Sequence, residues 1–386
     1  MKLEGIKVVD LSLFLPGPAM TQVMADHGAE VIKVEPLPQG EPNREIGLER
    51  DGVSVWFANT HRGKRSLTLN LKTEAGVEAL LRLAKSADVL VEAFRPGVVD
   101  RLGVGYRAVA ARNPRIVYAS ISAYGQSGPY VHKPAHDLAV EAMSGVLSVN
   151  LGWDDRPWNP ALAAADMLAC HIALAGVLMA LLRRERTGRG DYVDVAMMDS
   201  LIASMPNNYG PPLAEKRQPV AKDERSWGGN AMYRVYETRD GRFVALGGSE
   251  IKFAANLLSA LGRPDLIELC RLPPGPGQAP VRAFLVETFK TKRQAEWVKW
   301  MADKDVAFAP VKTLREGLDD PQVRHREMVV EDGRGCEHVG LPIKFADEPG
   351  AIDFRLPALG EHSKDILCGL GYTEAELAKM KAKGVY

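Results

Sequence analysis

Several features that would narrow the function of a protein are missing from this sequence of 386 residues. Its four cysteines, Cys170, Cys270, Cys336 and Cys368, lie far apart and form no C-x-x-C pair. Thiols spaced in this way favour free cysteines in a reducing compartment over disulfides or a zinc site. The sequence therefore predicts a cytoplasmic protein that holds no metal.

Net charge is also lacking, and so are long apolar runs. Lys plus Arg and Asp plus Glu both number 49, so no overall field draws the chain to nucleic acid or to an anionic membrane. The N-terminus has no apolar core of a signal peptide. The most apolar stretch, Met167 to Leu182, contains His171 and is short for a membrane span. We expect neither nucleic acid nor a membrane among the partners.

What is present is an alternation of short apolar runs with helical segments. The strand-like runs cover residues 6–11, 30–35, 66–70, 88–92 and 115–120. Such alternation predicts crossover units and a largely parallel sheet, an α/β fold with a Rossmann-like large domain. The usual nucleotide fingerprints are absent: Ser12–Pro18 lacks G-x-G-x-x-G, and Arg65 follows Lys64 where a Walker motif needs Ser or Thr. NAD and ATP are therefore not expected ligands.

Composition also predicts the domain organisation. We expect a large domain over residues 1–205, a Pro-, Gly- and charge-rich linker over 206–229, and a smaller α+β domain over 230–325. The smaller domain opens with a hairpin over Met232–Gly247 that turns at Arg239–Gly241. Residues 326–386 are expected to return to the large domain, and within them Thr373 and Glu376 form a capping box.

Asp166 is the first candidate for chemistry. It follows the small residues 161–165 and opens an apolar helical segment predicted from Met167 to about Glu185. An aspartate in this place commonly caps a helix, which stabilises the helix by ~1 kcal/mol. The same position would keep the carboxylate ionised and fix its direction, as a nucleophile requires. The residues alone leave both interpretations open.

His136, in Pro134–Asp137, and Glu250, which follows Gly247–Ser249, are two further candidates. A lone histidine is more often structural, and most surface glutamates are simply solvated. Paired with Asp166, however, His136 could flank a carbon acid, and the glycines could form a mobile loop over a ligand. The basic residues that could meet phosphates are Lys33, Arg62, Lys64, Arg65, Arg95, Arg101 and Lys133.

Seven motifs, in order along the chain, are more specific than these patterns. The motifs are Lys2–Asp10, Asp26–Glu35, Asn59–Leu67, Val91–Gly103, Ala123–Pro129, Arg184–Gly190 and Gly360–Leu367. The series resembles the class III CoA-transferase family, also called the CaiB/BaiF family, over nearly the whole chain. The resemblance implies an interlocked homodimer of chains with large and small domains. It also implies an acyl-CoA thioester as substrate, a small carboxylic acid as its partner, and no permanently bound cofactor.

The resemblance also implies which residues form the site. Asp166 takes the position of the family's catalytic aspartate. The predicted contacts to CoA are Gly17, Leu69, Ala93, Phe94 and Arg101, with Arg95 and Lys133 as further basic groups. One departure concerns Pro36, which follows Glu35 where transferases often have arginine. That phosphate or adenine contact is expected to come from another group or to be absent.

The family contains two activities, and this chain has features of both. His136 lies 30 residues before Asp166, and Glu250 precedes Lys252 and Phe253, as in α-methylacyl-CoA racemases. Racemases follow their aspartate with glycines, which let backbone N–H groups approach an enolate; here Met167–His171 follows, as in transferases. We therefore predict CoA transfer through an aspartyl anhydride at Asp166. The alternatives are racemisation by His136 and Asp166 with Glu250, or a non-catalytic CoA-binding protein.

Overall fold

The computed structural model describes residues 1–152 and 154–386 and divides into two compact units. The first unit comprises Met1–Ser144, Pro160–Ser204 and Pro321–Tyr386, and the second comprises Gly145–Asn159 and Met205–Asp320. Residues 206–229, expected as a linker, thus lie inside the second unit. So do residues 145–159, which the sequence assigned to the large domain.

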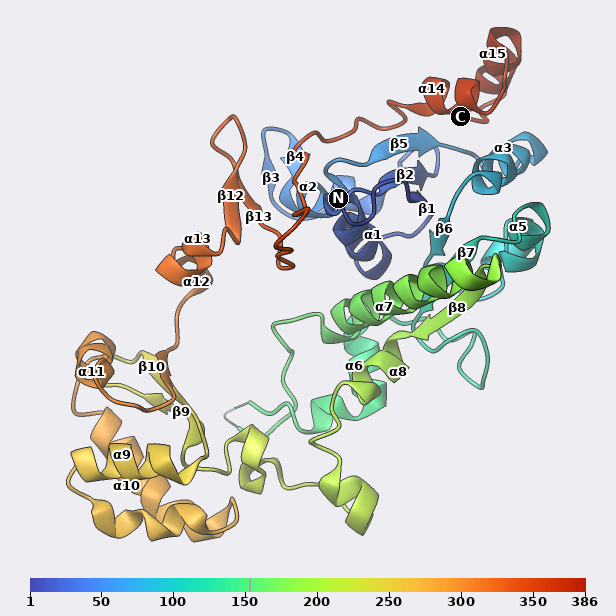
Figure 1. The fold of residues 1–386 in the computed structure, drawn as a ribbon. Coiled ribbons are helices and arrows are strands. Elements are labelled where there is room, and N and C mark those ends of the chain that lie inside the picture. The colour runs from blue at the N-terminus through green and yellow to red at the C-terminus, as the bar shows by residue number, and fades with distance from the viewer. Residues whose placement is uncertain (153) are drawn as a thin grey trace. The chain divides into compact units, whose positions relative to one another are not determined.

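A six-stranded sheet forms the centre of the first unit (Figure 1). The strands are β1 (Lys7–Asp10), β2 (Glu30–Glu35), β5 (Arg65–Thr68), β6 (Val89–Glu92), β7 (Val117–Ser122) and β8 (Asp191–Ala196). Each neighbouring pair is parallel, in the order β5-β2-β1-β6-β7-β8. Apolar residues such as Val8, Val9 and Leu90 are wholly buried, as expected for a parallel sheet covered on both faces. The predicted parallel sheet is confirmed, with strand ends shifted by one or two residues.

The strand order determines where a ligand site is expected. In chain order the sheet grows from β1 to β2 and β5, then restarts on the other side of β1 with β6. Parallel sheets bind ligands in the crevice beyond the carboxyl ends of the two strands where the order reverses, here β1 and β6.

The helices of this unit are α1 (Pro16–Asp26), α2 (Val55–His61), α3 (Glu74–Lys85), α4 (Val98–Arg101), α5 (Tyr106–Arg112), α6 (Asp137–Ser144), α7 (Ala164–Thr187), α8 (Met197–Ala203), α13 (Pro321–His325), α14 (Ser363–Gly369) and α15 (Glu374–Ala382).

Helix α7 is longer than the sequence predicted, since it begins at Ala164 and has 24 residues. Its length and composition would allow it to cross a membrane, but a single such helix is weak evidence because core helices share both properties. One face, which includes Ala169, Ala173 and Val177, is buried where α7 packs against α1, β7 and β8. α7 is therefore a core helix of the first unit, with its other face exposed.

The C-terminal segment covers the open edge of the sheet at β5. The backbone N–H of His362 donates to the Ser66 carbonyl oxygen at 3.0 Å. In return, the Ser66 N–H donates to Nδ1 of His362 at 3.1 Å, and the Thr68 N–H donates to Oγ of Ser363 at 3.1 Å. An exposed strand edge invites aggregation, so this segment protects the sheet. Beyond it, the capping box of Thr373 and Glu376 is confirmed at the start of α15.

The second unit is built on a three-stranded antiparallel sheet with the order β11-β10-β9. Its elements are β9 (Tyr233–Glu237), β10 (Phe243–Gly247), α9 (Ile251–Ala260), α10 (Ala279–Phe289), α11 (Gln294–Met301), β11 (Phe308–Pro310) and α12 (Leu314–Leu318). The predicted hairpin is confirmed as β9 and β10. Tyr236, Phe289 and Trp297 fill the core; the Phe289 ring centroid lies 5.1 Å from that of Tyr236 and 5.0 Å from that of Trp297.

Two short hairpins belong to the first unit: β3 (Glu49–Arg50) pairs with β4 (Val53–Ser54), and β12 (Val329–Glu331) pairs with β13 (Glu337–Val339).

Candidate active site

Asp166 lies in the first turn of α7, as its third residue. The cap position belongs to Ala163, whose side chain cannot bond the free N–H groups of the helix. Two acids of α6 do so instead. Oδ1 of Asp137 accepts the Asp166 N–H at 3.1 Å, and Oε1 of Glu141 accepts the Ala164 N–H at 3.2 Å. The interpretation of Asp166 as a helix cap is therefore wrong, and its carboxylate is free for another role.

The surroundings of Asp166 also correct the expectation that it stays fully ionised. Its carboxylate is half-buried and has no hydrogen bond or ion pair within residues 1–152 and 154–386. Burial, together with the negative charge of Asp137, raises the pKa of Asp166 to about 7. One turn on, burial raises the pKa of the Cys170 thiol to about 12, so this thiol is not a competing nucleophile. The site contains a basic, unpaired carboxylate.

His136 lies just outside the N-terminus of α6. Its carbonyl oxygen accepts the N–H groups of Ala139 and Val140, so it sits directly before the helix whose first residue, Asp137, contacts Asp166. The His136 ring is exposed and makes an edge contact with Phe14, at 5.7 Å between ring centroids. The structure thus brings together the N-termini of α6 and α7 and the loop after β1. The pairing of His136 with Asp166 stays a prediction.

Phe14 is a site residue that sequence reasoning missed. Its φ of 66° lies in the left-handed region, which costs energy for a residue with a side chain. The chain accepts this because both backbone groups of Phe14 are held. Its N–H donates to Oε1 of Glu41 at 2.9 Å, and its carbonyl accepts from Nδ2 of Asn43. Backbone strain of this kind is common at functional sites. The sequence carries no signal for it, because the φ angle of Phe14 is known only from the structure.

A buried ionic cluster is linked through Glu41 to the loop that carries Phe14. Lys33 pairs with Glu41 at 2.9 Å and with Asp10 at 3.6 Å, and Lys64 pairs with Asp10 at 3.2 Å. Burial raises the pKa of Asp10, but the two lysines outweigh it and hold that pKa at about 2. Burial lowers the pKa of Lys64 to about 8, against the attraction of Asp10. Lys33 and Lys64 were candidates for phosphate contact; their burial and pairing exclude that role.

The remaining basic candidates divide by exposure. Arg62 is buried and paired with Asp26 at 3.0 Å, and Arg65 is paired with Glu30 at 2.7 Å. By contrast, three of them are exposed and have no ion pair within the described part of the chain: Arg95, Arg101 and Lys133. Lys133 lies over the Tyr130 ring at 5.2 Å. These three remain the predicted phosphate contacts.

Glu35, which Pro36 follows, is paired with Arg44 of the same unit, and a phosphate or adenine contact from another group stays a prediction. Arg44 binds the Glu35 carboxylate through two nitrogens, at 2.8 and 2.7 Å. It also lies over the ring of Phe57, at 4.2 Å from the guanidinium carbon to the ring centroid. Glu35 at the end of β2 is thus buried and neutralised.

The other predicted CoA contacts lie at the carboxyl edge of the sheet. Gly17 is the second residue of α1, after β1; Leu69 follows β5; and Ala93 and Phe94 follow β6. A Cβ on Gly17 would lie 2.1 Å from Oγ of Ser12, so only glycine fits there. The Leu69 side chain is buried, and its N–H donates to the Glu35 carbonyl oxygen at 3.0 Å. These positions follow the carboxyl ends of β1, β5 and β6, and their contact with CoA stays a prediction.

Glu92, the last residue of β6, was also missed from the sequence. It is 1% exposed, and its carboxylate accepts the Phe94 N–H at 2.8 Å. Burial raises the pKa of Glu92 to about 7, against hydrogen bonds from Ser120 and Phe94. An acid of this kind at the crevice fixes the turn that presents Ala93 and Phe94. Its place at the end of a central strand was the available signal.

Glu250 belongs to the second unit, where it is exposed and directly precedes α9. The glycines before it are not a free loop. The Gly247 N–H donates to the Ala307 carbonyl at 2.8 Å, and the Gly248 N–H donates to the Met232 carbonyl at 3.1 Å. A Cβ on Gly248 would lie 2.4 Å from the Phe253 ring. These glycines therefore permit close packing, and the role of Glu250 beside Asp166 stays a prediction.

Comparison with known proteins fits this geometry. Residues 3–363 match the CoA-transferase family III. The chain is 32% identical to the succinyl-CoA–D-citramalate CoA-transferase of Chloroflexus aurantiacus, over 99% of this chain and 98% of that protein. It is 33% identical to the α-methylacyl-CoA racemase of Mus musculus, over 98% and 96%. A CaiB/BaiF family protein from Brucella suis superposes with a TM-score of 0.83 at 29% identity, over 95% and 99% of the two chains. The chain belongs to CoA-transferase family III, which includes both CoA-transferases and α-methylacyl-CoA racemases.

Proposed function

We propose that this protein transfers CoA from an acyl-CoA donor to a carboxylic acid, with Asp166 as the nucleophile. The observation that carries the proposal is the unpaired Asp166 carboxylate, half-buried on the first turn of α7. A carboxylate that serves only stability is normally paired or hydrogen-bonded when it is removed from water. A pKa near 7 also makes it a stronger nucleophile than an ordinary aspartate, while about half of it is ionised at neutral pH.

The steps follow from carboxylate and thioester chemistry. An Asp166 oxygen attacks the thioester carbonyl, forming a C–O bond and breaking the C–S bond, which gives a mixed anhydride and CoA thiolate. The acceptor carboxylate attacks the aspartyl carbonyl and expels the donor acid. CoA thiolate then attacks the acceptor acyl carbon, which forms the new thioester and releases Asp166 as a carboxylate. Each step exchanges one leaving group for one nucleophile, so no further reactant is needed.

Hydroxylamine trapping tests this proposal. Incubation with an acyl-CoA and hydroxylamine should convert Asp166 to a hydroxamate that mass spectrometry can locate, and Asp166→Asn should give no such product. Asp137→Asn is the matched control, because its residue touches Asp166 but is not the proposed nucleophile. Trapping at another residue, or CoA exchange that persists in Asp166→Asn, would reject the mechanism. CoA binding without exchange for any donor would instead favour a non-catalytic CoA-binding protein.

A racemase activity is the second candidate, and the place of His136 directly before the helix whose first residue contacts Asp166 favours it. A group with a pKa near 7 can accept a proton in one direction and donate it in the other. His136 lies at the start of the helix that contacts Asp166. Deuterium should then enter the α-carbon of a 2-methylacyl-CoA in D₂O. His136→Asn should abolish this exchange but leave anhydride formation intact, so one variant separates the two activities.

The proposal extends to the assembly and to CoA binding. We propose a Rossmann-like large domain that binds CoA through Gly17, Leu69, Ala93, Phe94 and the exposed bases Arg95, Arg101 and Lys133. We also propose an interlocked homodimer. Its support is an exposed apolar stripe on α7 that comprises Ile172, Ala175, Leu178, Met179 and Leu182. A stripe of this kind on a soluble chain is expected to be covered by another surface.

A further inference from the structure

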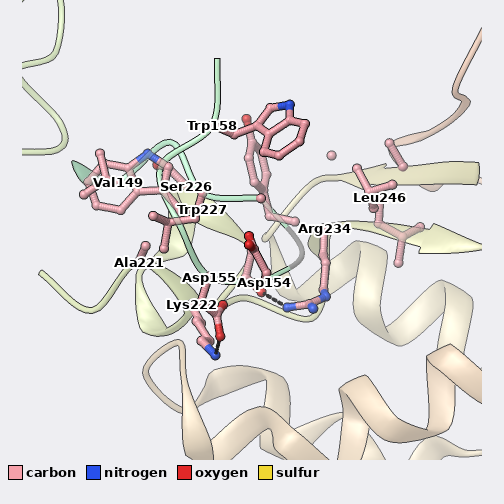
Figure 2. A pocket seen from close by; sticks show the side chains of 17 residues that line it. Val149, Asp154, Asp155, Trp158, Ala221, Lys222, Ser226, Trp227, Arg234 and Leu246 are labelled. Atoms are coloured by element: carbon pink, nitrogen blue, oxygen red, sulfur yellow. Dashed lines mark hydrogen bonds and ion pairs between the residues drawn. The ribbon is translucent and has the colours of Figure 1, made fainter. Parts of the chain in front are cut away.

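The second unit contains a cavity of about 960 Å³ that the proposed chemistry does not use. Its walls come from the segments 149–152, 154–158 and 221–228 and from strands β9 and β10 (Figure 2). The apolar and aromatic lining side chains are Val149, Leu151, Trp158, Ala221, Trp227, Tyr233, Val235, Ala245 and Leu246. The volume is at the upper end of small-molecule sites and far exceeds the needs of a two-carbon acid.

The cavity is continuous with the loop that carries Glu250. Gly247 lines it at the end of β10, and Glu250 follows three residues later. Arg225 joins the wall to this loop, because its Nε donates to Oγ of Ser249 at 2.9 Å. Its guanidinium carbon also lies 5.5 Å from the centroid of the Tyr233 ring. A ligand in the cavity would therefore lie beside the loop that the family resemblance assigns to the site.

The charges of the described lining residues balance. They are two acids, Asp154 and Asp155, and two bases, Lys222 and Arg234. Lys222 is neutralised by its ion pair with Asp155, and Arg234 donates to the Gly228 carbonyl at 2.6 Å. Figure 2 shows this ion pair at one side of the cavity, away from Trp158 and Leu246. A second carboxylate on a ligand would meet no net positive charge, and its desolvation would be poorly offset.

Several lining side chains are exposed although they are large and apolar. Trp158 is 65% exposed, Val235 is 47% exposed and Tyr233 is 39% exposed. Exposed apolar surface that lines a concave site, as these side chains do, gains free energy when an apolar ligand covers it. The lining therefore matches a ligand whose body is apolar and bulky.

We propose that this cavity holds the apolar tail of the acid or acyl group on which the protein acts. The inference rests on the proposed CoA-transfer function and specifies its substrate class: monocarboxylic acids with a bulky apolar body, in preference to small dicarboxylic acids. The volume, the apolar walls and the balanced charges each support this class.

Direct binding to the full chain tests the proposal. Calorimetry on Asp166→Asn with butyrate, hexanoate, octanoate and succinate measures affinity without turnover, so a failure of the anhydride mechanism leaves the result readable. Affinity should rise about fourfold for each added CH₂ from butyrate to octanoate. Succinate should bind at least about tenfold more weakly than octanoate. Equal affinity for succinate and octanoate, or no dependence on chain length, would overturn the proposal.

Two matched pairs of variants, each made in the Asp166→Asn chain, locate the binding. Val235→Asp puts a charge on the cavity wall and should weaken octanoate binding at least about tenfold, whereas Val298→Asp on α11, also partly exposed, should leave it within about twofold. Trp158→Ala and the exposed control Leu314→Ala repeat the comparison without adding charge. Identical affinities within both pairs would refute the assignment. Light scattering that shows Val235→Asp breaking an oligomer would mean that a second copy of the chain fills the cavity, which would also refute it.

Discussion

Asp166 shows how one residue type takes different roles in different surroundings. Asp10 is fully buried, yet two lysines hold its pKa at about 2. Asp166 is only half-buried, but no cation offsets this burial and the charge of Asp137 adds to it, so its pKa is raised to about 7. The difference comes from the partners and not from burial. Asp10 therefore stabilises the structure, whereas Asp166 is available for a substrate.

The raised pKa of Asp166 predicts a pH dependence of activity. Nucleophilic attack requires the ionised carboxylate, so the rate of anhydride formation should rise with pH and level off above about 7. Single-turnover trapping between about pH 5 and 9 measures this rate. A rate that is already maximal at about pH 5 would contradict it.

The same shift predicts an effect on stability. The folded chain holds the Asp166 proton more tightly than the unfolded chain does, so ionisation costs stability as pH rises from about 4 to 7. Asp166→Asn should therefore be more stable than the natural protein above about pH 7, on the order of 2 kcal/mol, and equal to it below about pH 4. Urea unfolding at both pH values measures the difference. Asp347→Asn, at an exposed site, should show no such dependence.

Phe14 offers a test of backbone strain near the site. Phe14→Gly removes the side chain that is strained at φ 66°, whereas Phe14→Ala keeps the strain, and both lose the ring contact to His136. We expect Phe14→Gly to be about 1 kcal/mol more stable than Phe14→Ala in urea unfolding. Turnover should fall equally in both, because the contact is lost in both. Equal stability of the two variants would show that the strain is absent.

At the scale of elements, α6 and α7 form a pair in which one helix caps the other. Because the first residues of α7 are alanines, its N–H groups depend on Asp137 and Glu141. This arrangement fixes the direction of Asp166, and the charge of Asp137 adds to the effect of burial in raising the pKa of Asp166. The sequence could not show it, since the two acids lie more than 20 residues before the helix that they cap.

Variants of Asp137 separate its capping of α7 from its effect on the pKa of Asp166. Asp137→Asn keeps an oxygen that can accept the Asp166 N–H but removes the charge, so the pKa of Asp166 should fall and the pH profile of activity should shift to lower pH. Asp137→Ala also removes the cap and should cost about 1 kcal/mol of stability. Asp347→Asn, at an exposed site, is the control and should leave the midpoint of the profile in place. An unchanged midpoint in Asp137→Asn would contradict the electrostatic role.

At the scale of the whole molecule, the sequence predicted features that depend on local pattern. The parallel strands and the β9–β10 hairpin follow from runs of apolar residues and from turn residues, and both are confirmed. Prediction from the sequence failed where contacts between distant parts of the chain determine the role of a residue or the start of a helix. Lys33 and Lys64 resemble phosphate ligands in the sequence, but Asp10 and Glu41 bury and neutralise them. The start of α7 was misplaced because its caps come from α6.

The apolar stripe on α7 carries the prediction for the assembled protein. Met179 and Leu182 are 66% and 69% exposed on a helix whose opposite face is packed against the sheet. If a second chain covers this stripe, Met179→Glu with Leu182→Glu buries two unpaired charges at the contact. The dissociation constant of the dimer should then rise at least about a hundredfold.

Light scattering over a range of protein concentrations measures this change. Leu314→Glu, at a 92% exposed apolar position on α12, is the matched control and should leave the dimer intact. A natural protein that is monomeric, or a double variant that dimerises as tightly as the natural protein, would show that α7 is not the contact. Loss of activity together with the dimer would show that a complete active site requires both chains, because neither Asp166 nor the ionic cluster beneath the Phe14 loop is altered.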